Sequence, residues 1–189
     1  MRRGADLPAW FLLIRKTLNR RFPYKTPVRY AIIFLTTQIC GGTAMEYRVF
    51  GDTVYIRMDR DDEIIGCILD VCRKEHIRSA VFTGIGGCKE ARIQTFLPDK
   101  SAFETQTVSG MLELVSLTGN VISDDDNELY HHTHGVFSYK EGEDHCVAAG
   151  HLKSVTVLYT AEIELRPVAG GIINRQFNPE TGTGLWRFQ

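Results

Sequence analysis

From Met45 onward, apolar and polar residues alternate along most of the chain. The segments 46–50 and 53–57 alternate on either side of a Gly-Asp pair, which is typical of two strands joined by a tight turn. Further strand-like runs cover residues 79–88, 92–97, 111–118, 130–139, 147–152 and 155–165. In the last run, alternation predicts that every second side chain lies on one face of a strand. These residues are Val155, Val157, Tyr159, Ala161, Ile163 and Leu165.

One segment has helical spacing. Apolar side chains recur every three or four positions between residue 64 and about His76, namely at Ile64, Ile65, Ile68, Leu69 and Cys72. This spacing predicts one amphipathic helix whose apolar stripe packs in the core. The carboxylates between Asp59 and Asp62 precede it and are suited to cap its N-terminus. Many strands and a single helix predict an α+β domain with a largely antiparallel sheet.

Glycines end the predicted strand 79–88, in the order Gly84-Ile85-Gly86-Gly87. A phosphate-binding loop would need a further glycine, a lysine and a following helix, whereas a strand is predicted to follow here. The sequence therefore favours a bulge or a close approach between two backbones at this point.

The charge of the chain changes at Met45. Residues 1–44 hold eight Lys and Arg against one Asp, a net charge of +7. Residues 45–189 hold fourteen Lys and Arg against twenty-two Asp and Glu, a net charge of −8. An acidic body is a poor electrostatic partner for nucleic-acid phosphates.

Residues 1–44 are interpreted as a basic N-terminal extension, and residues 45–189 as one domain large enough to build its own core. We favour Met45 as the true start, with the upstream stretch a mis-called extension; a disordered, targeting or membrane-surface segment is the alternative. The apolar runs 9–14 and 30–35 are too short to span a membrane. The five cysteines are odd in number and contain no Cys-x-x-Cys, which favours reduced thiols and a cytoplasmic location.

Histidines form the candidate chemistry of the chain. His132 and His134 are separated by one residue, so on a strand both side chains point to the same face. His151, from a neighbouring strand, would complete a set of three imidazoles around one metal ion, with a position left for water or substrate. A histidine-rich surface strand that binds no metal is the alternative.

Several segments in this order resemble the PPC domain, the plant and prokaryote conserved domain, also called PCC or DUF296. They are Met111–Ile122, His132-Thr133-His134, Ala149-Gly150-His151-Leu152, Glu162-Ile163-Glu164-Leu165 and the tail Phe177–Gly182. The resemblance covers about residues 46–188 and implies a compact α/β-sheet fold assembled as a homotrimer. It also implies that His132, His134 and His151 bind a metal, zinc or another divalent transition metal.

Two departures concern the plant members of this family, which bind DNA. Those proteins carry an Arg-Gly-Arg-Pro AT-hook, and this chain has none. They also carry an Arg-Phe-Glu-Ile-Leu type segment for contacts with transcription factors, where this chain has Met111 in place of the arginine. DNA binding by this chain is therefore the weaker expectation.

Three functions remain open at the level of sequence. The first is a trimeric metal-site module that binds a small ligand or a protein partner and has no assigned reaction. The second is a DNA-associated regulator, and the third is a zinc-dependent hydrolase or lyase acting on a small molecule. For the third, Glu113 is the candidate general base or ligand-orienting carboxylate, because the resemblance places its segment near the histidines. Its alternative role is a surface salt bridge.

Overall fold

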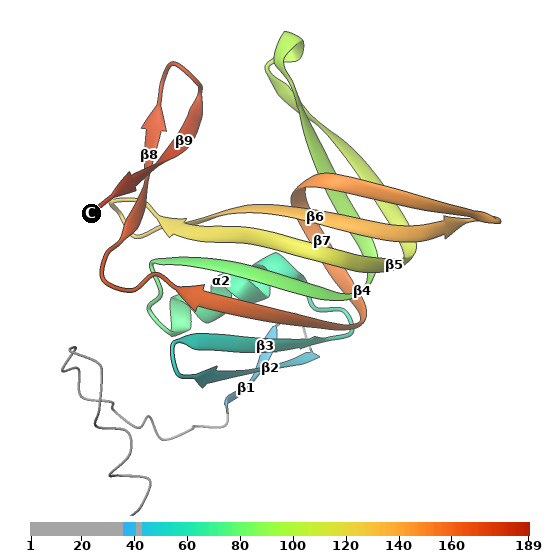
Figure 1. Cartoon of the computed structure of the whole chain (residues 1–189), viewed down its shortest axis with the longest axis horizontal. Coiled ribbons are helices and arrows are strands. Elements are labelled where there is room, and N and C mark those ends of the chain that lie inside the picture. The colour runs from blue at the N-terminus through green and yellow to red at the C-terminus, as the bar shows by residue number, and fades with distance from the viewer. Residues whose placement is uncertain (1–35, 41–42) are drawn as a thin grey trace, which may run out of the picture. The chain divides into compact units, whose positions relative to one another are not determined.

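The computed structural model describes residues 36–40 and 43–189, and all its strands belong to one hydrogen-bonded sheet (Figure 1). The strands are β1 (Thr36–Cys40), β2 (Thr43–Phe50), β3 (Thr53–Asp59), β4 (Ser79–Leu97), β5 (Ala102–Ser123), β6 (Leu129–Glu141), β7 (Asp144–Pro167), β8 (Ile173–Asn178) and β9 (Thr183–Phe188). Helix α2 (Ile64–Lys74) and the 3-10 turn η1 (Pro98–Lys100) complete the described elements. All pairings are antiparallel except a single parallel bridge between β5 and β8. The predicted α+β fold with a largely antiparallel sheet and one main helix is confirmed.

The order of the sheet is β1-β2-β3-β7-β4-β5-β8-β9, and β6 pairs with both β5 and β7. Because β4 also pairs with both β5 and β7, these four strands form a closed circuit. Their fully buried side chains share one core cluster with β3 and α2. The core includes Cys88, Leu112, Leu117, Phe137 and Leu152.

Helix α2 begins at a different cap from the one that the sequence suggested. The carboxylate of Glu63 accepts hydrogen bonds from the backbone amides of Ile65 (3.3 Å) and Gly66 (2.6 Å). The acids between Asp59 and Asp62 do not cap the helix. Asp62 is instead buried in the preceding turn, where it accepts a hydrogen bond from the Asp59 amide at 2.8 Å.

The helix ends at Lys74, two residues before the predicted limit at about His76. His76 has a left-handed backbone conformation, with φ of 55°, which cannot continue a right-handed helix. The Ile77 amide then donates to the Cys72 carbonyl at 2.8 Å and closes the helix end.

Strands β4 and β7 are each longer than predicted, because each joins two of the predicted runs across an irregular step. The pairing of β4 with β5 shifts between Gly84 and Gly86. At both glycines β7 comes very close: a Cβ on Gly84 would lie 2.8 Å from the Glu162 carbonyl oxygen, and one on Gly86 would lie 2.7 Å from that of Thr160. The prediction of a bulge with a close backbone approach is confirmed.

The predicted face of β7 is correct at five positions and wrong at one. Val155, Val157, Ala161, Ile163 and Leu165 are buried, whereas Tyr159 is 64% exposed. The reason is a register shift between β7 and β4. Val157 pairs with Cys88 and Ala161 pairs with Gly86, so three residues of β7 lie between these two pairs, opposite a single residue of β4. The extra residues bulge outward and carry the Tyr159 ring to the surface.

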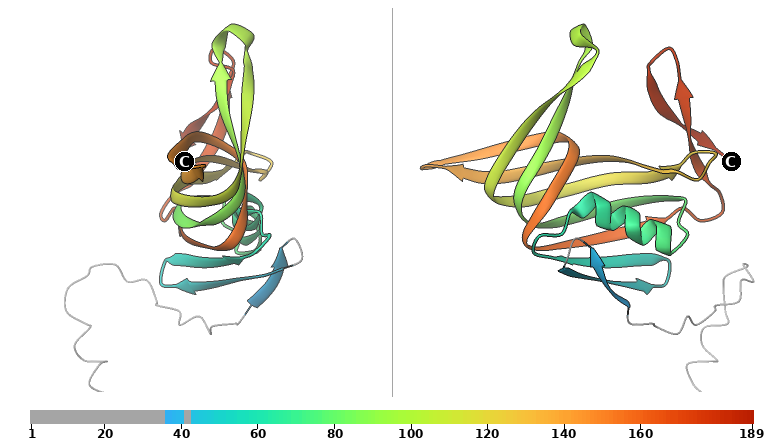
Figure 2. Two further views of the ribbon diagram at one scale, coloured as in Figure 1. Left: turned by 90° about the vertical axis from the view of Figure 1, so that its right-hand side faces the viewer. Right: turned by 180° about the vertical axis from the view of Figure 1, so that it is seen from behind.

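Two hairpins project on the same side of β6 and β7 (Figures 1 and 2). One is the outer part of β4 and β5, paired from Arg92 with Thr107 to Leu97 with Ala102. The other is formed by β8 and β9. These hairpins supply the walls of the candidate site described below.

The predicted boundary at Met45 falls inside β2, which pairs with β1. The two apolar runs, 9–14 and 30–35, lie outside the described residues, and the boundary stays a prediction. Among the residues described, no helix is long and apolar enough to cross a membrane. Cys67, Cys72, Cys88 and Cys146 are free thiols.

Candidate metal centre

Three histidines from two neighbouring strands converge at one point. His132 and His134 lie on β6, and His134 stands directly opposite His151 on β7. One ring nitrogen from each histidine can be chosen so that all three lie within 4.8 Å of one another. The Nε2 atoms of His132 and His134 are 3.2 Å apart. The structure thus brings together His132 and His134, which strand alternation predicted on one face, and His151, which was expected from a neighbouring strand.

The geometry of this group fits a tetrahedral metal site. Zinc–nitrogen bonds of about 2.0–2.1 Å separate neighbouring ligand nitrogens by about 3.3 Å in a tetrahedron. The distance of 3.2 Å between His132 Nε2 and His134 Nε2 is already close to this value. One ring nitrogen of His151 lies within 4.8 Å of a ring nitrogen of each, so a small rotation of its ring would bring that nitrogen to the same spacing. Imidazole donors suit zinc and other divalent transition metals.

The surroundings keep two of these rings in the form that binds metal. Burial, and then the neighbouring His134, lowers the pKa of His132 below its ordinary value of 6.5. Burial also lowers the pKa of His151, and the other histidine rings lower it further. A lower pKa favours the neutral imidazole, whose free lone pair can bind a metal ion near neutral pH.

His131 does not join the group. Its Nδ1 lies 3.1 Å from Thr133 Oγ1, and Thr133 is fully buried. On the other side of the site, the ring of Phe103 stacks on His151, with centroids 5.7 Å apart and planes at 26°. Phe103 therefore fixes one face of the His151 ring.

The histidines open into a cavity of about 620 Å³ between the two projecting hairpins. Its walls are Gln94, Thr95, Phe96, Phe103, Asn120, Ile122, Tyr130, His131, His132, His134, Gly150, His151, Arg175, Thr183, Gly184 and Trp186. Among these described lining residues there is one permanent cation, Arg175, and no carboxylate. The Oδ1 atom of Asn120, a residue paired with His132 across β5 and β6, is buried without a hydrogen-bond partner.

Glu113, the candidate carboxylate, lies outside the histidine cavity. It stands on β5 opposite Gly87 and Ser138, and it lines a separate hollow with Met111 and Tyr159. Along β5 it is five residues from Thr118, the partner of His134, a separation of about 16 Å in an extended strand. The fold therefore does not bring Glu113 to the histidines.

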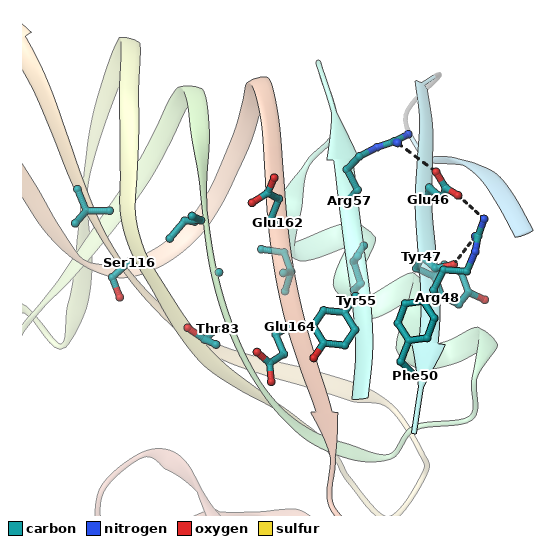
Figure 3. A pocket seen from close by; sticks show the side chains of 15 residues that line it. Glu46, Tyr47, Arg48, Phe50, Tyr55, Arg57, Thr83, Ser116, Glu162 and Glu164 are labelled. Atoms are coloured by element: carbon teal, nitrogen blue, oxygen red, sulfur yellow. Dashed lines mark hydrogen bonds and ion pairs between the residues drawn. The ribbon is translucent and has the colours of Figure 1, made fainter. Parts of the chain in front are cut away.

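A third hollow, of about 740 Å³, opens on the outer face of the sheet across β2, β3, β7, β4 and β5 (Figure 3). Its charges are largely paired: Glu46 forms ion pairs with Arg48 and, at 3.2 Å, with Arg57. The aromatic rings of Phe50 and Tyr55 border it, 6.0 Å apart. The residues lining this hollow include no histidine or cysteine, so it offers no comparable metal site.

Sequence reasoning identified the three histidines but missed Arg175, Asn120 and the aromatic walls. Asn120 lies in the segment Met111–Ile122 that carries the family resemblance, whereas Arg175 and the aromatic residues Phe96, Phe103 and Trp186 come from segments with no local motif for a site. Arg175 and Trp186 lie in the C-terminal hairpin, and only the pairing of β8 with β5 places them in the cavity with His132. No short-range spacing could have revealed them.

Comparison with known proteins points to one family. The family model described as the Plants and Prokaryotes Conserved (PCC) domain matches residues 45–168. A search of curated proteins found no match.

Three solved structures share the fold. A plant- and prokaryote-conserved (PPC) protein from Pyrococcus horikoshii is 33% identical, with a TM-score of 0.64, 76% of this chain and 94% of that chain covered. A metal-containing protein from Archaeoglobus fulgidus is 28% identical, with a TM-score of 0.63, and the match covers 77% of this chain and 99% of that chain. A Bacteroides thetaiotaomicron protein, whose name proposes DNA binding, is 26% identical, with a TM-score of 0.69 and coverage of 76% and 97%.

Proposed function

Since the chain belongs to the Plants and Prokaryotes Conserved (PCC) domain family, we propose that it is a homotrimeric metal-binding module that captures a small ligand or a protein partner. His132, His134 and His151 hold one divalent metal ion, which we assign as zinc. The observation that carries this proposal is the placement of their three ring nitrogens within 4.8 Å of one another. The metal-containing relative from Archaeoglobus fulgidus supports it. Zinc on three imidazoles supplies a Lewis acid with one open coordination position.

Metal analysis of the purified full-length protein tests this assignment. We expect about one zinc per chain in the wild type and loss of that metal in His132→Ala, because two imidazoles hold zinc far more weakly than three. His145→Ala is the matched control, since His145 is exposed on β7 and lies outside the group. A full complement of metal in His132→Ala, or none in zinc-treated wild type, would refute the assignment.

Binding is better supported than hydrolysis or elimination. A zinc hydrolase needs a group that accepts a proton from the attacking water, and a carboxylate commonly fills that role. The described residues that line the histidine cavity include no carboxylate, and Glu113 lines a different hollow. The cavity is also open between its two hairpins, which suits capture of a ligand.

DNA binding is the second candidate, favoured by the name of the Bacteroides thetaiotaomicron relative. The charge of the chain opposes it. Duplex binding draws on lysines and arginines that neutralise phosphates, whereas residues 45–189 carry a net charge of −8. We therefore rank it below metal and ligand binding.

Self-association is the remaining part of the proposal, and the outer face of the sheet supports it. Ile85 and Val115 are 54% and 55% exposed, and both border the hollow of Figure 3. Tyr159 and Met111 extend this apolar surface into the neighbouring hollow. An apolar surface of this kind is typical of a protein–protein interface. We propose that these residues form the contact between protomers of the trimer.

A further inference from the structure

We propose that the cavity beside the three histidines selects a small anionic ligand with an aromatic or apolar body, and that Arg175 binds its carboxylate or phosphate group. This inference rests on the proposed metal site and names the class of ligand that the site takes. Three features support it: the position of Arg175, the charge of the lining, and the aromatic walls.

Arg175 is held in place by packing contacts on both sides of its side chain. Its guanidinium carbon lies 4.6 Å from the centroid of the Tyr130 ring, a cation–π contact. The side chain also crosses the backbone of β9 at Gly184, where an added Cβ would lie 2.8 Å from Arg175 Cζ. The absence of a side chain at Gly184 therefore creates the space that Arg175 occupies.

Within the described part of the chain no carboxylate forms an ion pair with Arg175 within 4 Å, although Arg175 attracts the nearby Asp124 electrostatically. The ion pairs found there involve Arg48, Arg57, Arg73, Lys89, Arg166 and Arg187. Asp124 is nearby, but its Oδ2 accepts a hydrogen bond from the Tyr130 hydroxyl at 3.0 Å and it forms no ion pair with Arg175 within 4 Å. The fork of guanidinium N–H donors remains available to a ligand that can accept two hydrogen bonds.

The charge of the lining favours an anion. The histidines are neutral ligands, so a divalent metal would bring its full charge to a cavity that already holds Arg175. The described lining contains no Asp or Glu to balance these charges. A carboxylate or phosphate supplies the missing negative charge, whereas a neutral or cationic molecule leaves it unbalanced.

The walls indicate the rest of the ligand. Phe96 and Phe103 come from one hairpin and Trp186 from the other, and all three border the cavity. The volume of about 620 Å³ suits a small molecule. The site thus combines an anion-binding end with an apolar body.

The test uses full-length protein loaded with one equivalent of zinc, titrated by calorimetry with benzoate, phenylphosphonate and the neutral analogue benzamide. We expect at least one of the two anions to bind about tenfold or more tightly than benzamide. Cobalt-substituted protein is titrated in parallel, because its visible spectrum reports a change at the metal. Metal content is measured in every sample.

Two variants isolate the role of Arg175. Arg175→Gln removes the charge, and Gly184→Ala should displace the side chain while leaving it in the protein. Both should weaken binding of the anion about tenfold or more and leave the metal content unchanged. Arg73→Gln is the control: it removes the same charge from the exposed end of α2, where Arg73 pairs with Asp70 and lies outside the histidine cavity, and it should bind as wild type does.

The outcomes separate this inference from the proposed function. Loss of zinc from the wild type overturns the metal site on which both depend. Stoichiometric zinc together with equal binding of benzoate, phenylphosphonate and benzamide overturns the anion assignment alone. Unchanged anion binding in both Arg175→Gln and Gly184→Ala also overturns it, because another group would then hold the anion.

Discussion

Each histidine of the candidate metal centre owes its position to one place in a strand pairing. His134 faces His151 across β6 and β7, and His132 follows on the same face two residues away. A shift of the register by one residue would turn the β6 rings to the opposite face. Gly150, next to His151, has a backbone φ of 153°, and a Cβ added to it would lie 3.0 Å from Ile93 Cγ2. A side chain at this position would therefore disturb the strand that carries His151.

The buried thiols allow a prediction at the same scale. Burial raises the pKa of Cys72 and of Cys88 to about 12, so at pH 8 each remains protonated and unreactive. Cys146 is only partly buried. We expect iodoacetamide at pH 8 to label Cys146 in the native protein and to spare Cys72 and Cys88, as read by peptide mass spectrometry.

Labelling of the same protein in denaturant is the control, and all three cysteines should then react. Equal labelling of Cys72, Cys88 and Cys146 in the native protein would contradict the packing described here.

At the scale of elements, Glu63 ties helix α2 to the sheet. Its carboxylate caps the helix through the Ile65 and Gly66 amides, and Oε1 also accepts a hydrogen bond from the Val155 amide of β7 at 3.1 Å. One side chain thus accepts hydrogen bonds from backbone amides of both α2 and β7, although Val155 lies 92 residues after Glu63 in the sequence. A capping acid that did not face β7 would lack the hydrogen bond from the Val155 amide.

Glu63→Ala should therefore destabilise the domain. Loss of the cap and of the strand contact is expected to lower the free energy of unfolding by about 1–3 kcal/mol. Chemical denaturation followed by circular dichroism measures this change.

Asp61→Asn is the comparison, because Asp61 belongs to the acidic run that the sequence suggested as the cap. Asp61 is exposed and pairs with Lys89 at the surface, and asparagine tolerates its left-handed backbone. Its loss should cost less than Glu63→Ala. The reverse order would show that the cap lies in the acidic run after all.

At the scale of the whole molecule, function depends on surfaces that a single strand does not define. The histidine cavity lies between two hairpins, and the apolar face proposed as the trimer contact spans β4, β5 and β7. These surfaces differ in chemistry. The first is cationic and aromatic, while the second combines exposed apolar side chains with the carboxylates Glu113 and Glu162 and has the ion pairs of Glu46 at its edge.

Light scattering of the full-length protein tests the proposed assembly. Wild type should have the mass of a trimer, and Val115→Glu should lower it to that of a monomer, because a charge would be buried in the contact. Phe177→Glu is the control, since Phe177 is 58% exposed on β8 and lines neither hollow of this face. A trimer that survives Val115→Glu would move the contact elsewhere.

Local patterns in the sequence determined the element types and the histidine group. The helix at Ile64, Ile65 and Ile68 could be predicted because its spacing repeats over a few residues, and side chains at such spacing share a face. His132 and His134 could be predicted for the same reason, since alternation alone puts them on one face. The bulge and the close backbone approach at the glycines of β4 could also be predicted, because glycine inside a strand is typical of such positions.

Tertiary structure decided what depends on the pairing of distant segments. It turned Tyr159 outward through a register shift against β4, made Glu63 the cap through a contact with β7, and separated Glu113 from the histidines. It also brought Arg175 beside the histidine cavity. None of these follows from local spacing, because the energy of each contact comes from partners tens of residues away along the chain.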